Sequence, residues 1–161
     1  TWGNLSVRLD DTYMLVTPSG MDYTRLTPRD MVKVSISTLE YEGSLKPTSE
    51  KSLHAEIYKK RPDAGAVIHT HSKYCSVFAA AERALHINDP EMQEIFGGQV
   101  NLAEYALPGT DKLMNNTVKA LGDNFGCIMS HHGMVTCGAD LETSFDNCVK
   151  LEECGKAALG L

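Results

Sequence analysis

Apolar and polar residues alternate at the start of the chain, which is the pattern of a strand with one buried face. Leu5, Val7 and Leu9 alternate with polar neighbours, and a turn leads to a second such run over residues 13–17. The two runs predict a hairpin. Further strands are predicted at residues 32–37, 67–68, 127–130 and 134–136.

Helices are predicted where apolar residues recur three or four positions apart. Ser49, Thr110 and Asp140 are each placed to cap a helix that begins at the next residue. A further helix is expected over residues 73–84, whereas residues 86–108 are expected to be rich in loops. Hairpins mixed with helices predict an α/β protein whose sheet is largely antiparallel.

The length of 161 residues is enough to bury one core, so we expect a single domain over residues 1–161. Hydrophobic residues make up 42% of the chain and charged residues 22%, which is ordinary for a soluble globular protein. The net charge of -6 argues against a protein that binds nucleic acid, because such proteins carry a basic surface. No apolar run is long enough to predict a segment that spans a membrane.

The five cysteines are odd in number and contain no C-x-x-C pair. This usage is typical of a reducing compartment in which thiols serve as small hydrophobic groups, so we expect a cytoplasmic protein. The chain begins with Thr1 rather than Met, and we expect it to be trimmed at both ends relative to the natural product.

Two histidines at the end of a predicted strand are the strongest chemical signal. His69 and His71 are two residues apart, so their side chains point to the same face of that strand. Such a pair can hold a divalent metal if a third ligand arrives from elsewhere. The alternative is that the pair arises by chance on a half-buried strand.

A second histidine cluster follows another predicted strand and offers the third ligand. His132 is favoured over His131, because the glycine after it lets the backbone come close and turn sharply. Three imidazoles with an open fourth position are typical of a catalytic metal centre rather than a structural one. His54 and His86 are interpreted as surface or helix-packing residues.

Hydroxyl and glycine residues near predicted turns suggest an anion site. Thr48 and Ser49 precede Glu50 at a helix start, where exposed N–H groups suit a phosphate. Asn4 and Ser19-Gly20 lie at strand ends where backbone N–H groups can form an anion-binding concavity. The alternatives are plain helix capping for the first group and turn chemistry for the second.

Five motifs occur in order along most of the chain and resemble the class II aldolase/adducin family, most of all its aldolases for L-fuculose 1-phosphate. The resemblance implies a three-layer α/β/α fold with a central, mainly antiparallel sheet. It also implies a homotetramer with active sites between subunits. The motifs are Gly3-Asn4-Leu5-Ser6, Thr17-Pro18-Ser19-Gly20, Pro47-Thr48-Ser49-Glu50, His69-Thr70-His71 and His131-His132-Gly133.

By this resemblance His69, His71 and His132 bind one zinc ion per subunit, although other divalent transition metals also suit imidazoles. Glu50 is then the acid/base carboxylate, and we expect a dry pocket to raise its pKa. The residues that fall where the family holds the substrate phosphate are Gly3, Asn4, Ser19, Gly20, Thr48 and Ser49.

The implied function is zinc-dependent cleavage of a ketose 1-phosphate, such as L-fuculose 1-phosphate, to dihydroxyacetone phosphate and a short aldehyde such as lactaldehyde. The metal stabilises the enediolate that forms when the carbon–carbon bond breaks. The family's aldolases carry a tyrosine where residues 88–93 have none, and a leading helix and a C-terminal tail that the chain lacks.

Three alternatives remain from the resemblance. One is a sugar-phosphate dehydratase of the methylthioribulose 1-phosphate type. Another is an L-ribulose-5-phosphate 4-epimerase, although epimerases typically carry Asp at the position of Glu50. The third is an adducin-like binding module without catalysis, which the intact set of histidines disfavours.

Overall fold

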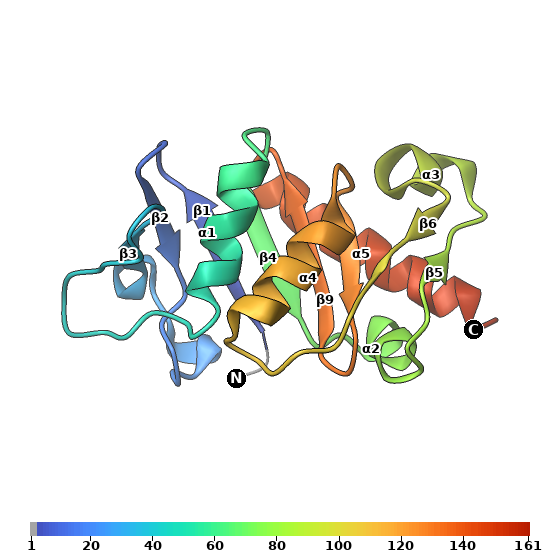
Figure 1. The fold of residues 1–161 in the computed structure, drawn as a ribbon, viewed down its shortest axis with the longest axis horizontal. Coiled ribbons are helices and arrows are strands. Elements are labelled where there is room, and N and C mark those ends of the chain that lie inside the picture. The colour runs from blue at the N-terminus through green and yellow to red at the C-terminus, as the bar shows by residue number, and fades with distance from the viewer. Residues whose placement is uncertain (1–2) are drawn as a thin grey trace.

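The computed structural model describes residues 3–161, which form strands and helices along one chain (Figure 1). Two of the short helices, η1 and η2, are 3₁₀ helices. The elements are β1 Asn4–Arg8, β2 Tyr13–Val16, η1 Tyr23–Arg25, η2 Pro28–Asp30, β3 Val32–Ser35, α1 Lys51–Lys60, β4 Ala66–Thr70, α2 Lys73–Ala80, β5 Leu85–His86, α3 Pro90–Phe96, β6 Gln99–Val100, β7 Leu102–Ala103, α4 Asp111–Leu121, β8 Gly126–Met129, β9 Gly133–Gly138 and α5 Leu141–Ala158.

A sheet of seven strands forms the centre of the molecule, in the order β3-β2-β1-β4-β9-β8-β7. Every neighbouring pair is antiparallel except β7 and β8, which are parallel. Helices α1 and α4 lie in front of this sheet in Figure 1, and α5 lies behind it. The prediction of a three-layer α/β/α fold with a mainly antiparallel sheet is confirmed.

Alternation along β4 divides the core into two clusters. Val67 packs in the cluster that contains the apolar residues of α1 and α4. Ile68 packs in the other cluster, with residues of α2 and α5. Because successive side chains point to opposite faces, His69 points to the same face as Val67 and therefore toward the α1 layer.

Two of the predicted helix caps are confirmed. The Thr110 hydroxyl accepts a hydrogen bond from the Leu113 N–H at 3.3 Å, and the Asp140 carboxylate accepts one from the Thr143 N–H at 2.7 Å. The prediction for Ser49 is wrong, because the N-cap of α1 is Glu50 and no side chain completes that cap. This leaves the carboxylate of Glu50 to make other contacts.

The helix expected over residues 73–84 is longer than the one observed. Helix α2 ends at Ala80, because Glu82 has a positive φ of 52° that an α-helix does not accommodate. Residues 86–108 are also more regular than predicted, since they include α3. A signal for α3 is present: Asp89 caps it by accepting from the Met92 N–H at 3.1 Å, and Pro90 occupies its first turn.

All five cysteines lie in the described part of the chain and are unpaired, four of them buried. They pack as small apolar groups, as the sequence predicts. Between residues 3 and 161, no helix combines the length and the hydrophobicity needed to cross a bilayer.

Candidate metal centre and active site

Three histidines converge at one edge of the central sheet. His69 is the second-last residue of β4, and His71 directly follows the end of that strand, so both side chains point to one face. His132 comes from the turn between β8 and β9. The backbone in this turn is left-handed at His131, with a φ of 53°, and His132 follows directly.

The three rings are arranged around a common point. Their centroids lie 4.7 to 5.0 Å apart and their planes are inclined by 66° to 71°. The Nε2 atoms of His69 and His71 are 3.0 Å apart, and one ring nitrogen from each of the three histidines lies within 4.8 Å of the others. The structure thus brings together the residues that the spacing singles out.

The buried ring of His69 is fixed in the orientation that a metal ligand needs. Its Nδ1–H donates to the Met134 carbonyl at 2.9 Å, which leaves the Nε2 lone pair facing His71. Burial lowers the pKa of His69 to about 4, although the neighbouring Glu50 acts in the opposite direction. A neutral imidazole held by a backbone carbonyl is the usual form of a histidine ligand.

The donor set fits a transition-metal ion. Nitrogen ligands of one tetrahedral zinc lie about 3.3 Å apart, close to the separation of the His69 and His71 nitrogens. Glu50 Oε1, which lies 3.5 Å from His132 Nε2, is buried and has no hydrogen-bond partner among the residues that the structure describes. A buried polar atom without a partner beside nitrogen donors indicates that a further group belongs there.

Two glycines allow the strands to approach closely enough for this convergence. Gly3 has a φ of 96°, and a Cβ atom there would collide with the His69 carbonyl. A Cβ atom on Gly133, directly after His132, would collide with the Thr70 carbonyl. Both glycines therefore let neighbouring backbone pack closely against the segment that carries His69 and His71.

Glu50 lies between two of the imidazoles. Its Oε2 atom is 3.4 Å from His69 Nε2, and its Oε1 atom is 3.5 Å from His132 Nε2. The Asn4 amide nitrogen donates to Oε2 at 2.7 Å. Because Glu50 is the N-cap of α1, the position of this carboxylate depends on how α1 packs against the sheet.

The expectation of a raised pKa for Glu50 is wrong. Burial alone raises the pKa, but His69, the hydrogen bond from Asn4 and His132 together outweigh it, so the pKa of Glu50 is lowered. The carboxylate is therefore ionised near neutral pH and starts as a base rather than an acid.

The two loops that carry most of the predicted phosphate residues lie side by side. The Ser19 N–H donates to the Lys46 carbonyl at 2.7 Å, and the Thr48 N–H donates to the Thr17 carbonyl at 3.0 Å. The Thr48 hydroxyl also accepts from the Glu50 N–H at 3.3 Å. The backbone amide of Ser19 is thus already used within the chain, and its hydroxyl is the group that remains to meet an anion.

The other predicted phosphate residues border the same region. Ser49 and Gly20 are exposed, while Gly3 and Asn4 are partly buried at the start of β1. Gly20 has a positive φ of 74° and open space around it. Asn4 differs from the rest, because its side chain bonds to Glu50 and to His54.

The interpretation of His54 as a surface or helix-packing residue misses its main contacts. The ring is fully buried, and its two nitrogens face the Asn4 carbonyl oxygen at 2.6 Å and the Ser6 hydroxyl at 2.7 Å. His86 is exposed, in keeping with its interpretation as a surface residue. A signal for His54 exists in the sequence, since it lies four residues after Glu50 and hence on the same helix face.

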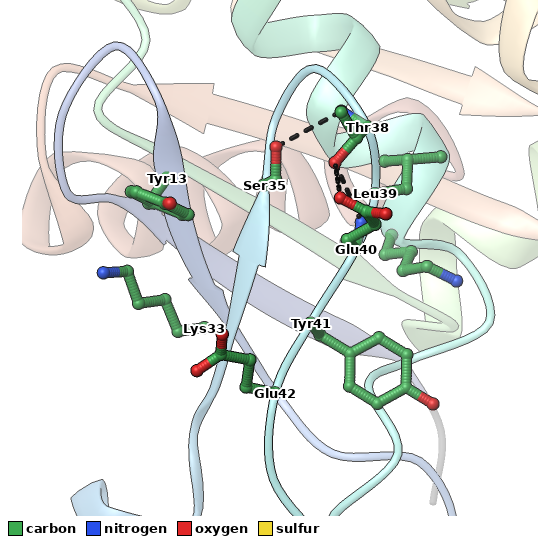
Figure 2. Close-up of a pocket in the computed structure, with 9 residues that line it drawn as sticks. Tyr13, Lys33, Ser35, Thr38, Leu39, Glu40, Tyr41 and Glu42 are labelled. Atoms are coloured by element: carbon green, nitrogen blue, oxygen red, sulfur yellow. Dashed lines mark hydrogen bonds between the residues drawn. The ribbon is translucent and has the colours of Figure 1, made fainter.

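A separate cavity of about 860 Å³ lies beside β2 and β3 (Figure 2). Its walls include Tyr13, Lys33 and Tyr41, and the Lys33 ammonium sits 3.9 Å above the Tyr13 ring. In the loop after β3, the Thr38 hydroxyl donates to the Glu40 carboxylate at 3.1 Å (Figure 2). None of its lining residues is a predicted ligand or acid/base group, although Lys51 directly follows Glu50.

Acid is expected to destabilise the metal-free protein through His54. Burial lowers the pKa of this ring to about 4 from 6.5, so below pH 6.5 the unfolded chain binds a proton that the folded chain does not. His54 alone therefore lowers the free energy of unfolding by about 2 kcal/mol between pH 7.5 and pH 5. Urea unfolding in the presence of a chelator measures the total change. The His54→Gln variant should lose the share that His54 contributes, while the share of His69, whose pKa burial also lowers to about 4, should remain. An equal pH dependence in that variant would contradict the argument.

Comparison with known proteins connects this arrangement to one family. Residues 1–159 match the family described as "Class II Aldolase and Adducin N-terminal domain". The chain is 36% identical over 153 residues to the 5-methylthioribulose-1-phosphate/5-deoxyribulose-1-phosphate aldolase of Rhodospirillum rubrum. The aligned region covers 95% of the chain and 68% of that protein. The chain is also 35% identical over 142 residues to the L-fuculose phosphate aldolase of Escherichia coli O6:H1, and this alignment covers 88% of the chain and 65% of that protein.

A solved structure of an L-fuculose 1-phosphate aldolase superposes with a TM-score of 0.91 at 33% identity and covers 98% of the chain and 74% of that structure. The chain thus spans about two thirds of the length of the two curated relatives. The prediction of a metal-dependent lyase of the class II aldolase type agrees with the names of these relatives. The resemblance indicated by the five motifs is confirmed, and the chain belongs to the class II aldolase and adducin family.

Proposed function

We propose that the protein is a zinc-dependent aldolase that cleaves a ketose 1-phosphate to dihydroxyacetone phosphate and a short aldehyde. L-fuculose 1-phosphate, which gives lactaldehyde, is the first candidate substrate. The observation that carries the proposal is the position of the Glu50 carboxylate, 3.4 and 3.5 Å from two of three converging imidazoles. A carboxylate beside three nitrogen donors combines a proton acceptor with an open metal site.

His69, His71 and His132 would hold the metal through neutral ring nitrogens. Zinc suits three imidazoles with an open fourth position better than magnesium or calcium, which prefer oxygen ligands. When bound, the ion acts as a Lewis acid that stabilises the negative charge of the enediolate.

Glu50 would move the proton at the reacting carbon. In the condensation direction the ionised carboxylate removes a proton from the carbon next to the ketone of dihydroxyacetone phosphate. In the cleavage direction the hydroxyl on the carbon that becomes the aldehyde loses its proton, and the electrons of the broken carbon–carbon bond remain on the carbon next to the ketone. Glu50, once it has taken up a proton, delivers it to that carbon, so one proton is released and one is taken up. The lowered pKa of Glu50 supports the first of these steps, because the group starts ionised.

The substrate phosphate would bind beside the start of α1. Thr48 and Ser49 precede this helix, whose N-terminus carries partial positive charge. The loop of Ser19 and Gly20 is bonded to the same segment through Lys46, and Gly3 and Asn4 begin the neighbouring strand. Roles for these groups in phosphate binding are part of the proposal.

We also propose a cytoplasmic homotetramer whose active sites lie between subunits. Five unpaired cysteines support a reducing compartment. His71 is the most exposed of the three histidines, so the site opens to the surface of a single chain where a neighbouring subunit could cover it.

A second candidate substrate is 5-methylthioribulose 1-phosphate or 5-deoxyribulose 1-phosphate. The relative from Rhodospirillum rubrum, an aldolase for these compounds by name, is 36% identical to the chain. They share the ketone and phosphate of L-fuculose 1-phosphate and differ in the aldehyde released. Dehydration or epimerisation would require the same enediolate-forming groups but would release no dihydroxyacetone phosphate.

Product identity tests the proposal. The zinc-loaded protein is incubated separately with L-fuculose 1-phosphate, 5-methylthioribulose 1-phosphate, 5-deoxyribulose 1-phosphate and L-ribulose 5-phosphate. We expect dihydroxyacetone phosphate from at least one ketose 1-phosphate, measured by a coupled reductase, and the aldehyde identifies the preferred substrate. Loss of water without dihydroxyacetone phosphate would indicate a dehydratase, and an isomeric pentulose phosphate an epimerase. Zinc-loaded protein that turns over none of the four compounds would contradict the proposal.

A further inference from the structure

Helix α1 and strand β1 share a row of buried polar side chains next to the candidate site. Glu50, the N-cap of α1, is followed at intervals of four residues by His54 and Tyr58, and the three lie on one face of the helix. On β1, Asn4 and Ser6 are two residues apart and also share a face. Four residues of helix advance about 6 Å and two residues of strand about 6.6 Å, so the two rows stay in register.

The side chains of the two rows alternate in one hydrogen-bonded chain. From the site inward, Asn4 bonds to Glu50 at 2.7 Å, His54 to Asn4 at 2.6 Å, Ser6 to His54 at 2.7 Å and Tyr58 to Ser6 at 2.8 Å. Ser6, His54 and Tyr58 are almost completely buried, with exposed fractions of 0%, 0% and 2%. Buried polar groups of this kind are costly unless every member finds its partner.

The carboxylate at the end fixes the direction of every bond. An ionised carboxylate only accepts, so the Asn4 amide nitrogen must face Glu50 and its carbonyl oxygen must face His54. His54 therefore carries its proton on Nε2 and accepts at Nδ1 from the Ser6 hydroxyl. Ser6 in turn accepts from Tyr58. Burial lowers the pKa of His54 to about 4, in keeping with a ring that has a single proton.

We propose that His54 is a positioning residue for Glu50, acting through the amide of Asn4. This inference rests on the proposed function of Glu50 as the proton-transfer group. By holding the Asn4 amide in one orientation, His54 keeps one Glu50 oxygen, Oε2, engaged. The other oxygen, Oε1, has no hydrogen-bond partner among residues 3–161 and is left to exchange the proton.

His54 reinforces the orientation of Asn4 that Glu50 requires. If the amide rotated by half a turn, its oxygen would face the Glu50 carboxylate, and two acceptors would meet. The same rotation would place the Asn4 amide nitrogen against the Nε2–H of His54, so two donors would meet at the other end. On the far side of the ring, the Ser6 hydroxyl donates to His54 Nδ1 and accepts from Tyr58, which matches this tautomer.

The first test is independent of activity. In the zinc-loaded protein labelled with ¹³C and ¹⁵N, long-range proton–nitrogen NMR spectra report the tautomer of each histidine. We expect His54 to be neutral with its proton on Nε2. We also expect His54→Phe, which keeps a ring but removes both nitrogens, to shift the Asn4 side-chain amide and the Glu50 carboxyl carbon signals. A proton on Nδ1 of His54, or unshifted Asn4 and Glu50 signals in the variant, would overturn the proposal.

The second test is kinetic and uses the substrate that the parent protein turns over best. We expect His54→Phe to lower kcat about 10- to 100-fold, as for other groups that orient a reacting residue, while KM and the zinc content stay nearly constant. His54→Gln restores an N–H donor toward Asn4 and should recover much of the loss. Tyr58→Phe and Ser6→Ala lie further along the chain and should have smaller effects.

The outcomes separate this proposal from the proposed reaction. If the parent protein releases no dihydroxyacetone phosphate, the reaction is wrong and the NMR result alone decides the role of His54. If the parent is active but His54→Phe loses thermal stability with an unchanged kcat, His54 is a packing residue and the proposal is wrong. If His54→Phe does not fold, the tautomer of His54 in the parent protein decides, and a proton on Nδ1 instead of Nε2 would refute the proposal.

Discussion

Glu50→Gln is expected to lower turnover about 10²- to 10⁴-fold while leaving zinc bound, because glutamine has the shape of the carboxylate but cannot accept the proton. The surroundings favour a clean comparison. The glutamine carbonyl oxygen can still accept from Asn4, and the three imidazoles keep their places. Steady-state release of dihydroxyacetone phosphate measures the loss, and metal analysis of the purified variant measures the zinc.

A matched control for this change is available on the same helix. Glu56 lies on α1 away from the histidines and pairs with Lys59 at 3.5 Å. Glu56→Gln makes the same chemical change without touching the site, so its turnover should stay at the parental value. Equal rates for Glu50→Gln and the parent protein would remove Glu50 from the proton transfer.

The fold could be predicted from the sequence where one physical cause dominates. In β4 the alternation of Val67 and Ile68 sends one side chain to each core cluster, and the same alternation places His69 and His71 on one face. The caps at Thr110 and Asp140 each depend on one side chain and on the backbone N–H three residues later. Both groups can be located in the sequence. Such local causes need no knowledge of the rest of the chain.

The errors have two different causes. At the start of α1 two hydroxyl residues compete: Ser49 looks like a cap, but the Thr48 hydroxyl accepts from the Glu50 N–H and Glu50 itself becomes the N-cap. At the end of α2 a distant segment is involved. Helix α2 stops early at a left-handed Glu82, whose carboxylate meets His131 at 2.6 Å, forty-nine residues further along the chain.

The candidate site shows the same division. Convergence of the histidines could be inferred because each cluster follows an apolar strand, and strand ends in one sheet can meet at an edge. The partners of Asn4 could not be inferred, because its contact with His54 depends on how β1 and α1 are aligned. Spacings of two in the strand and four in the helix are visible in the sequence, but only packing shows that the two rows match.

His71→Ala is expected to remove the metal and with it the activity, since two imidazoles rarely hold zinc alone. His71 is the best of the three positions for this test. His69 is fully buried and bonded to the Met134 carbonyl, so its removal would also disturb the core. His71 follows the end of β4 and is the most exposed of the three, so the fold should survive.

The measurement is the zinc content after dialysis, together with the rate of dihydroxyacetone phosphate release. We expect less than about a tenth of the parental zinc in His71→Ala, given that loss of even an outer-shell partner weakens metal binding 10- to 100-fold. His86→Ala deletes an exposed histidine outside the site and should retain both zinc and activity. Full zinc occupancy in His71→Ala would show that the metal binds elsewhere. His71 Nε2 lies only 3.0 Å from His69 Nε2, so an ion bound by His69 would also be bound by His71.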